Sequence, residues 1–278
     1  MAVVTELWRY PVKSMLGERL DEADIGTHGI TGDRSFALID TATGKVCSAK
    51  RHDLWGKMFT LHARLDVPGR AIIAFPDGSE HATDEADLSE RLSSFLGRQV
   101  ALSSTAPPNA SIEEIWDDSK GDKMYGPATG ESSDGNAVIA YPASLASPGD
   151  FFDVSAIHYI TTNTLREFAR REPDSTFDVR RFRPNIVIDV EGEEGFIEND
   201  WKVVRIGDLE LNTIIAVPRC VMTTLAQDDL PRDPNVLRST ARHNRLDIGG
   251  LGMMPCAGID AAVGAGGTIR VGEAVQYS

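Results

Sequence analysis

Val203-Val204-Arg205-Ile206-Gly207-Asp208-Leu209-Glu210-Leu211 is the stretch of this chain that decides its fold. Two short apolar runs flank the dipeptide Gly207-Asp208, which is the sequence signature of a β-hairpin closed by a two-residue turn. The C-terminus repeats this pattern, because residues 268–271 and 274–275 flank Gly272-Glu273. We therefore predict a hairpin at both places.

Further short strands are predicted at residues 35–40, 70–75 and 185–190, and turn residues follow the first two at 41–44 and 76–78. Many short strands separated by tight turns are typical of β-barrels and sandwiches.

Two predicted helices interrupt the strands. The apolar residues of 88–96 recur at helical spacing, and Gly97 is placed to end that helix. A second helix begins after the candidate hydroxyl caps Thr161 and Thr162 and ends at Pro173. The chain is therefore predicted to be mostly β with a few helices, an α+β fold.

The composition is that of a globular protein, with 278 residues, 41% hydrophobic and 25% charged. A net charge of −14 argues against a protein that coats nucleic acid or an anionic membrane surface. The N-terminus lacks the pattern of a signal peptide, and three scattered cysteines are too few for a disulfide framework. We therefore expect a cytoplasmic protein with neither nucleic acid nor membrane among its partners.

A cysteine stands between a cation and two hydroxyls in Arg219-Cys220-Val221-Met222-Thr223-Thr224, directly after the predicted strand and Pro218. A neighbouring cation favours the thiolate, which can attack an electrophile or bind a soft metal. The alternative is a buried structural cysteine, which is common in proteins.

Cations are conspicuous in so acidic a chain. They occur early in the sequence and again in the run Arg180-Arg181-Phe182-Arg183; the early ones are Lys13, Arg34, Lys50 and Arg51. If the fold brings them together, the result is a positive pocket that suits a phosphorylated cofactor. The alternative is ordinary solvated surface charge.

Several familiar site motifs are absent from the sequence. It contains no Gly-x-Gly-x-x-Gly, no phosphate loop ending in Gly-Lys-Ser/Thr, no His-Glu-x-x-His and no Gly-x-Ser-x-Gly. No Cys-x-x-Cys pair supports a zinc ribbon or an iron–sulfur cluster.

Five segments, in order, resemble the MOSC-domain proteins that carry an N-terminal β-barrel domain. They are Tyr10-Pro11-Val12-Lys13-Ser14, Gly32-Asp33-Arg34, Arg181-Phe182-Arg183-Pro184-Asn185, Asp200-Trp201 with Ile206-Gly207, and Arg219-Cys220-x-x-Thr223-Thr224. Within that group the chain is similar to the amidoxime-reducing relatives and their bacterial homologues. The resemblance implies a β-barrel-like N-terminal domain over residues 1–105, a long connecting loop over 106–148 and a β-barrel MOSC domain over 149–278.

The resemblance also implies a molybdenum cofactor with no iron–sulfur cluster in this chain. Cys220 would be the protein ligand of the metal and the catalytic residue. The pterin and its phosphate would be held by Lys13, Ser14, Arg34, Lys50, Thr161, Arg183, Asn185 and Arg219. The chain departs from the family at Pro218 and at residues 225–231, on the substrate side of the expected pocket.

The expected function is reduction of small N-hydroxylated or N-oxide compounds, with electrons from a separate donor protein. Two alternatives stay open at this point. Cys220 could carry a persulfide in sulfur transfer, or the protein could bind the cofactor without catalysis.

Overall fold

The computed structural model describes residues 1–116, 128–144 and 150–278. These residues form two compact units. Unit 1 consists of residues 1–9, 19–31 and 155–278, and unit 2 consists of residues 10–18 and 32–154. The predicted boundary at residue 105 does not separate the units, because the first strand of the chain pairs with a strand almost two hundred residues later.

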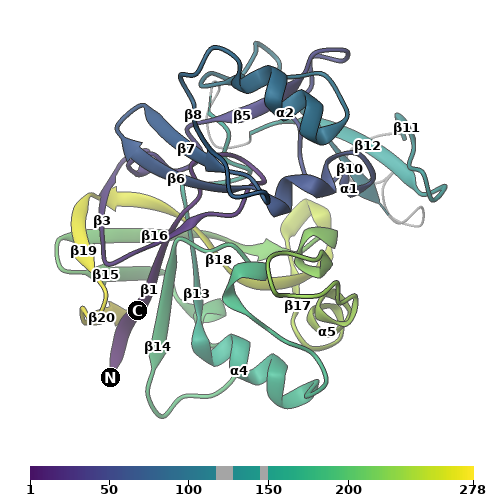
Figure 1. Cartoon of the computed structure of the whole chain (residues 1–278). Coiled ribbons are helices and arrows are strands. Elements are labelled where there is room, and N and C mark those ends of the chain that lie inside the picture. Colours follow the sequence, from purple (N-terminus) through teal and green to yellow (C-terminus); the bar gives the residue numbers. More distant parts are fainter. Residues whose placement is uncertain (117–127, 145–149) are drawn as a thin grey trace. The chain divides into compact units, whose positions relative to one another are not determined.

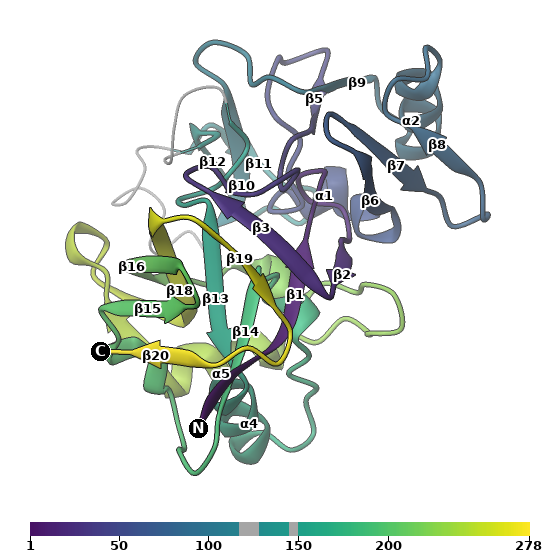
Figure 2. The same cartoon turned by 90° about the vertical axis from the view of Figure 1, so that its left-hand side faces the viewer.

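Unit 1 is built around one large sheet. Its strands follow the order β2-β1-β14-β13-β18-β16-β15-β20, and β17 pairs with β18 off this path. The bounds are β1 Ala2–Arg9, β2 Glu18–Leu20, β13 Ile157–Thr161, β14 Ile186–Val190, β15 Val203–Ile206, β16 Leu209–Pro218, β17 Arg245–Asp247, β18 Met253–Ala265 and β20 Val275–Tyr277. Figure 2 shows β1 running beside β14.

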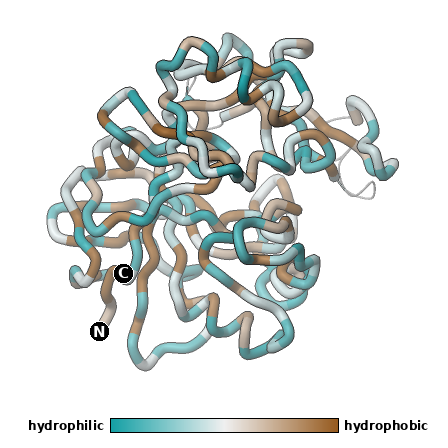
Figure 3. The backbone as a smooth tube through the Cα atoms, in the orientation of Figure 1, coloured by the Kyte–Doolittle hydropathy of each residue, from teal (hydrophilic) through white to brown (hydrophobic). Residues whose placement is uncertain are grey.

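Burial against β14 explains how β1 joins this sheet, and a β-bulge between Val4 and Glu6 shifts the register of the pair. Val4 and Leu7 of β1 lie in one apolar cluster with Ile186 and Ile188 of β14. Apolar stretches, brown in Figure 3, follow the strands of this unit. A local sequence pattern cannot reveal such a distant partner, so the strand and its pairing were not predicted.

The barrel expected for the MOSC domain is present only as an open path of strands. An isolated antiparallel bridge joins Val3, beside β14, to Ala274, just before β20. No sheet of the described residues closes into a barrel, although the mostly β, α+β class is as predicted.

The hairpin at residues 203–211 is confirmed, because β15 and β16 pair across Gly207-Asp208. The predicted C-terminal hairpin was wrong. β19 (Gly267–Arg270) pairs with β3 (Glu22–Gly26), whereas β20 pairs with β15. The turn at Gly272 therefore carries the chain from one sheet to another, and β4 (Gly29–Ile30) completes the small sheet β19-β3-β4.

Both predicted helices are confirmed. α2 (Leu88–Leu96) ends at Gly97, whose φ of 71° is left-handed, and α4 (Thr162–Arg171) begins after Thr161. The sequence reasoning missed α1 (His52–Trp55) and α5 (Asn235–His243). α5 carries few apolar residues, so the stripe that identifies a helix is weak. No helix in the described ranges is long and apolar enough to cross a membrane.

Unit 2 consists of small sheets and helices (Figure 1). Its sheets are β5-β9, β6-β7-β8 and β10-β12-β11. The bounds are β5 Ala37–Asp40, β6 His62–Val67, β7 Arg70–Ala74, β8 Glu80–Ala82, β9 Val100–Ser103, β10 Ser111–Trp116, β11 Gly130–Glu131 and β12 Ala137–Pro142. Short 3-10 helices occur in both units: η1 Gly56–Thr60, η2 Val179–Arg181, η3 Ile197–Asp200, η4 Val221–Thr224 and η5 Gly249–Leu251.

The segment 106–148, expected as a connecting loop, contains β10, β11 and β12 where the structure describes it. Ile112 on β10 and Val138 and Ile139 on β12 are buried, which explains why these residues form strands. The abundance of Ser, Pro, Asp and Gly in the segment concealed the short apolar runs. Residues 117–127 and 145–149 of this predicted loop lie outside the described residues.

Candidate functional site

Cys220 is the cysteine of this chain that is not fully buried. It directly precedes η4 and is partly exposed, whereas Cys47 and Cys256 are buried. Burial raises the pKa of the Cys47 thiol, and it raises the pKa of Cys256 to about 11. Those two thiols therefore stay protonated and inert, whereas the Cys220 thiol belongs to a partly exposed residue.

Arg219 points its guanidinium into the protein. Nε donates to Ala257 O (2.8 Å), Nη1 donates to Phe182 O (3.0 Å), and Nη2 lies 2.6 Å from Nε2 of His158. Burial lowers the pKa of Arg219 to about 10. Most of its donors are thus already used, so Arg219 fixes the chain before Cys220 and has little capacity left for a ligand.

His158 on β13 contacts three residues of the predicted site. Its Nδ1 lies 3.4 Å from Arg183 O, its Nε2 faces Arg219, and its backbone N–H donates to Asn185 Oδ1 (3.2 Å). A guanidinium can only donate, so this contact requires Nε2 as acceptor and the proton on Nδ1. His158 was not among the predicted site residues. The only local signal for His158 is that it is a histidine within a run of buried strand residues.

Asn185 joins neighbouring segments of unit 1. Its backbone N–H donates to His158 O (2.7 Å), and its Nδ2 donates to Trp8 O (3.3 Å). Only 2% of its surface is exposed. These contacts give Asn185 a structural role whether or not it also meets a cofactor.

Thr161, another predicted cofactor contact, caps α4. Its Oγ1 accepts from the Thr164 N–H and donates to Oε2 of Glu198 (2.7 Å). Thr161 and Glu198 are both 0% exposed. Burial raises the pKa of Glu198, although the hydrogen bonds from Thr161 and Thr164 act in the opposite direction. The Thr161 hydroxyl is therefore used in hydrogen bonds that stabilise the fold.

In unit 2 two predicted cations share one carboxylate. Lys13 Nζ donates to Phe151 O (2.7 Å) and Asp153 Oδ1 (2.5 Å), and Lys50 Nζ lies 3.4 Å from Asp153 Oδ2. The lysine side chains are 7% and 13% exposed, whereas that of Asp153 is 47% exposed. The Asp153 carboxylate is therefore much more exposed than the two lysines that it contacts.

Charge on the lysines decides the ionisation of this cluster. Burial favours the neutral acid of Asp153, but the nearby Lys13 and Lys50 outweigh it and hold the Asp153 pKa well below its usual value. Burial also lowers the pKa of Lys13, and repulsion from Lys50 and Arg34 adds to that effect. The two lysines therefore lie close together, with Asp153 against both of them and Glu114 4.0 Å from Lys50 Nζ. The sequence analysis missed Asp153, which follows two phenylalanines and has no motif.

Lys50 also donates to Tyr141 Oη (2.8 Å), and Tyr141 donates to Glu114. Tyr141 and Glu114 belong to β12 and β10, the strands missed in the predicted loop.

Ser14 and Arg34 have unusual backbones in unit 2. Their φ values are 62° and 46°, and Arg183 of unit 1 has a φ of 54°. The described residues contain five non-glycine residues with positive φ, and three of them were predicted to bind the cofactor. Such backbones are strained and gather at ligand sites.

The side chains of these left-handed residues are also engaged. Ser14 Oγ accepts from the Ala49 N–H (3.1 Å). The Arg34 guanidinium pairs with Asp33 (2.5 Å) and stacks 4.5 Å above the Tyr10 ring. Both conformations are therefore locked by tertiary contacts.

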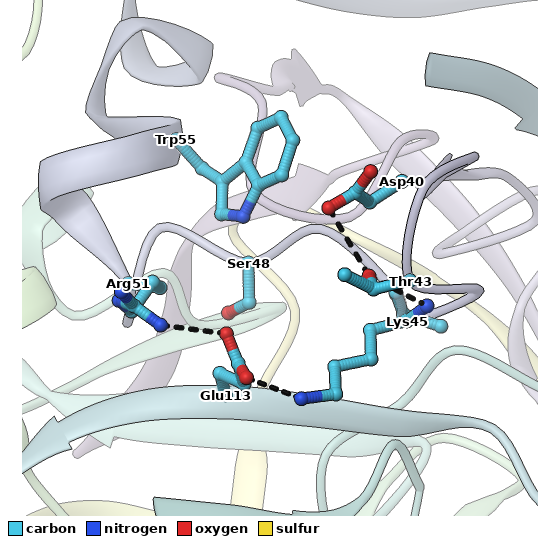
Figure 4. A pocket seen from close by; sticks show the side chains of 8 residues that line it. Asp40, Thr43, Lys45, Ser48, Arg51, Trp55 and Glu113 are labelled. Atoms are coloured by element: carbon cyan, nitrogen blue, oxygen red, sulfur yellow. Dashed lines mark hydrogen bonds and ion pairs between the residues drawn. The ribbon is translucent and has the colours of Figure 1, made fainter. Parts of the chain in front are cut away.

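The pocket in Figure 4 lies elsewhere in unit 2. In this pocket Glu113 forms ion pairs with Lys45 and Arg51, so the charges of these side chains largely offset one another. Its lining includes Arg51, one of the early cations, but none of the residues predicted to hold the cofactor or the metal. It is not a candidate for the predicted cofactor site.

The structure thus places the predicted residues in two groups. Unit 1 brings together Arg183, Asn185 and Arg219 around His158, with Cys220 next in sequence to Arg219; Thr161 lies on the same strand as His158. Unit 2 brings together Lys13 and Lys50 at Asp153, and Arg34 is near enough to affect both Lys13 and Asp153. Ser14 adjoins Lys13 in the chain.

Comparison with known proteins identifies both parts of the chain. The MOSC domain model matches residues 147–276, and the MOSC N-terminal beta barrel domain model matches residues 1–104. Mitochondrial amidoxime reducing component 2 of Rattus norvegicus is 26% identical over 99% of this chain and 83% of its own length. The Bos taurus protein of that name gives the same three values. Human molybdenum cofactor sulfurase is 23% identical over 89% of this chain but only 29% of its own length. The chain belongs to the MOSC-domain proteins that carry the MOSC N-terminal beta barrel domain.

Proposed function

We propose that this protein is a molybdenum-cofactor-dependent oxidoreductase that reduces small N-hydroxylated or N-oxide compounds. The observation that carries the proposal is the backbone strain at Ser14, Arg34 and Arg183, three residues expected to hold the cofactor. The relatives named amidoxime reducing component and molybdenum cofactor sulfurase support an association with this cofactor.

The residues present fit such a group. Cys220 is accessible, and a soft thiolate suits a molybdenum centre. The buried lysines of unit 2 and Arg34 suit a phosphate, because charge-assisted hydrogen bonds to anions are among the strongest in proteins. When bound, the cofactor supplies the oxidation–reduction chemistry.

The chain's own residues have separable tasks in this proposal. Cys220 ligates the metal, Lys13, Lys50 and Arg34 neutralise the phosphate, and Arg183 orients the pterin. Arg219 and His158 hold the backbone before Cys220 through the hydrogen bonds of Arg219 to Ala257 and Phe182 and through their contact with each other. Electrons come from a separate donor protein, and the proposed location is cytoplasmic.

Sulfur transfer is the second candidate, because one relative is a molybdenum cofactor sulfurase and Cys220 is an accessible thiol. In that case Cys220 carries a persulfide and the purified protein holds no molybdenum. Cofactor binding without catalysis is the third reading.

Metal analysis of protein produced in molybdenum-replete cells separates the three. We expect about one molybdenum per chain in the parent and in Cys256→Ala, and almost none in Cys220→Ser. Lys13→Met should lower the molybdenum content as well. A metal-free parent with a reducible persulfide on Cys220 would establish sulfur transfer instead. A loaded parent that turns over no N-hydroxylated or N-oxide compound with an artificial reductant would leave only binding.

A further inference from the structure

Two arginines, the buried Arg181 and the partly exposed Arg219, hold the chain on either side of Cys220. Arg219 fixes the residue before it, as described above. Arg181, on η2, reaches residues 221–231, the segment after it, and residues 225–231 of this segment depart from the family pattern. Within the described residues, neither guanidinium has a carboxylate as its hydrogen-bond partner.

Arg181 is only 2% exposed, and its guanidinium donates to four backbone carbonyls. Nε donates to Thr176 O (3.0 Å), and Nη1 donates to Thr223 O and Leu225 O (3.3 Å each). Nη2 donates to Pro231 O (2.8 Å). A buried cation is costly unless it is hydrogen-bonded, so the guanidinium and this segment depend on each other. Three of the four acceptors belong to residues 221–231, the segment that follows Cys220.

Arg180 binds the same segment from the solvent side. Its Nη1 lies 2.8 Å from Asp229 and 3.6 Å from Asp228, and its Nη2 lies 2.8 Å from Asp178. Asp228 and Asp229 form the tip of a tight turn closed by hydrogen bonds between Gln227 and Leu230. The adjacent arginines of η2 therefore both bind residues 221–231. Arg181 does so from the protein interior and Arg180 from the solvent side.

We propose that Arg181 is the positioning residue of Cys220: it holds the carbonyls of the following segment and so fixes where the sulfur stands. Arg180 and Arg181, which the sequence grouped with other cations as candidates for a positive pocket, instead bind this segment. The inference rests on the proposed function only for the role of Cys220 as metal ligand.

The rate of alkylation of Cys220 by iodoacetamide tests this without any cofactor. Cys47 and Cys256 are 1% and 0% exposed, so labelling of the native protein reports on Cys220. Removing charge-assisted hydrogen bonds frees the segment to open, so Arg181→Met should accelerate labelling about tenfold. Arg180→Met is the matched control on the same turn, and its partly exposed ion pairs predict a smaller change, below about threefold.

Peptide mapping assigns the label to individual cysteines. A folded Arg181→Met variant that labels Cys220 at the parent rate overturns the inference. So does equal acceleration at Cys47, since that indicates general loosening. If Arg181→Met does not fold, Arg181→Lys retains the charge with fewer donors and should give an intermediate rate; a parent-like rate there also overturns it. Low molybdenum in the parent, with the labelling pattern as expected, would reject the proposed function and leave the positioning role intact.

Discussion

Replacing Lys13 by Met should destabilise the empty protein by about 2 kcal/mol. A hydrogen bond to a charged group contributes about 1.5–3 kcal/mol, and Lys13 makes two such bonds, to Phe151 O and Asp153. Breaking a fully buried pair costs about 3–5 kcal/mol, because the remaining charge is stranded. Asp153 is 47% exposed and can rehydrate after the substitution, so we expect a cost below that range, about 2 kcal/mol.

Urea unfolding followed by circular dichroism measures this cost, and Arg64→Met is the matched control. Arg64 and Glu80 also form an ion pair in unit 2, but their side chains are 47% and 52% exposed. Such exposed pairs contribute about 0–1 kcal/mol. A Lys13→Met variant that loses no more stability than Arg64→Met would refute the reasoning that a desolvated lysine pair exists here.

Acid titration gives an independent check on the same cluster. The pKa of Asp153 is lowered in the folded protein, so its stabilising contribution is present above the carboxyl pKa of the unfolded chain, about 3.9. That contribution is lost as the pH falls from there toward the folded pKa. The stability difference between the parent and Asp153→Asn should therefore be constant at neutral pH and shrink progressively below about pH 4. A difference that does not change with acid would mean that the lysines do not hold this carboxylate.

Two further predictions concern buried polar groups of unit 1. Burial raises the pKa of Glu198, so the folded protein binds more protons than the unfolded chain above pH 4.5, and stability falls as the pH rises through that window. Glu198→Gln should remove this fall, which melting curves from pH 4 to 8 would detect; an unchanged pH profile would contradict it. Gln227 is 2% exposed, and neither atom of its side-chain amide has a partner among the described residues. Gln227→Leu should therefore stabilise the empty protein by about 1 kcal/mol, or about 2–4 °C in Tm, and a lower Tm would show that the amide is satisfied.

Local patterns predicted those parts of the fold that local chemistry determines. The hairpin across Gly207-Asp208 and the start of α4 at Thr161 both depend on neighbouring residues, and both are confirmed. The C-terminal turn at Gly272 has the same two-residue form, yet its flanking strands join different sheets. Turn chemistry specifies a reversal, whereas the partner of each strand depends on burial against distant residues.

The site divides in the same way. Residue type and motif led to the prediction of Cys220 and Lys13 as site residues. His158 and Asp153 belong to no motif, because each acts through partners far away in sequence. The same limit explains Arg219. A cation before a thiol suggests activation of that thiol, whereas the structure directs the guanidinium to carbonyls of other segments.

Backbone strain adds information that residue types cannot provide. Glycine adopts a positive φ at almost no cost, whereas Ser14 and Arg34 pay about 1–3 kcal/mol each for it. The tertiary contacts to Ala49, Asp33 and Tyr10 explain how these conformations are held, but glycine would meet the backbone requirement more cheaply. Retaining a hydroxyl and a guanidinium there therefore favours a use for the side chains themselves. Arg183 repeats this pattern in the other unit, which is why strain at predicted contact residues supports a ligand more strongly than their charge alone.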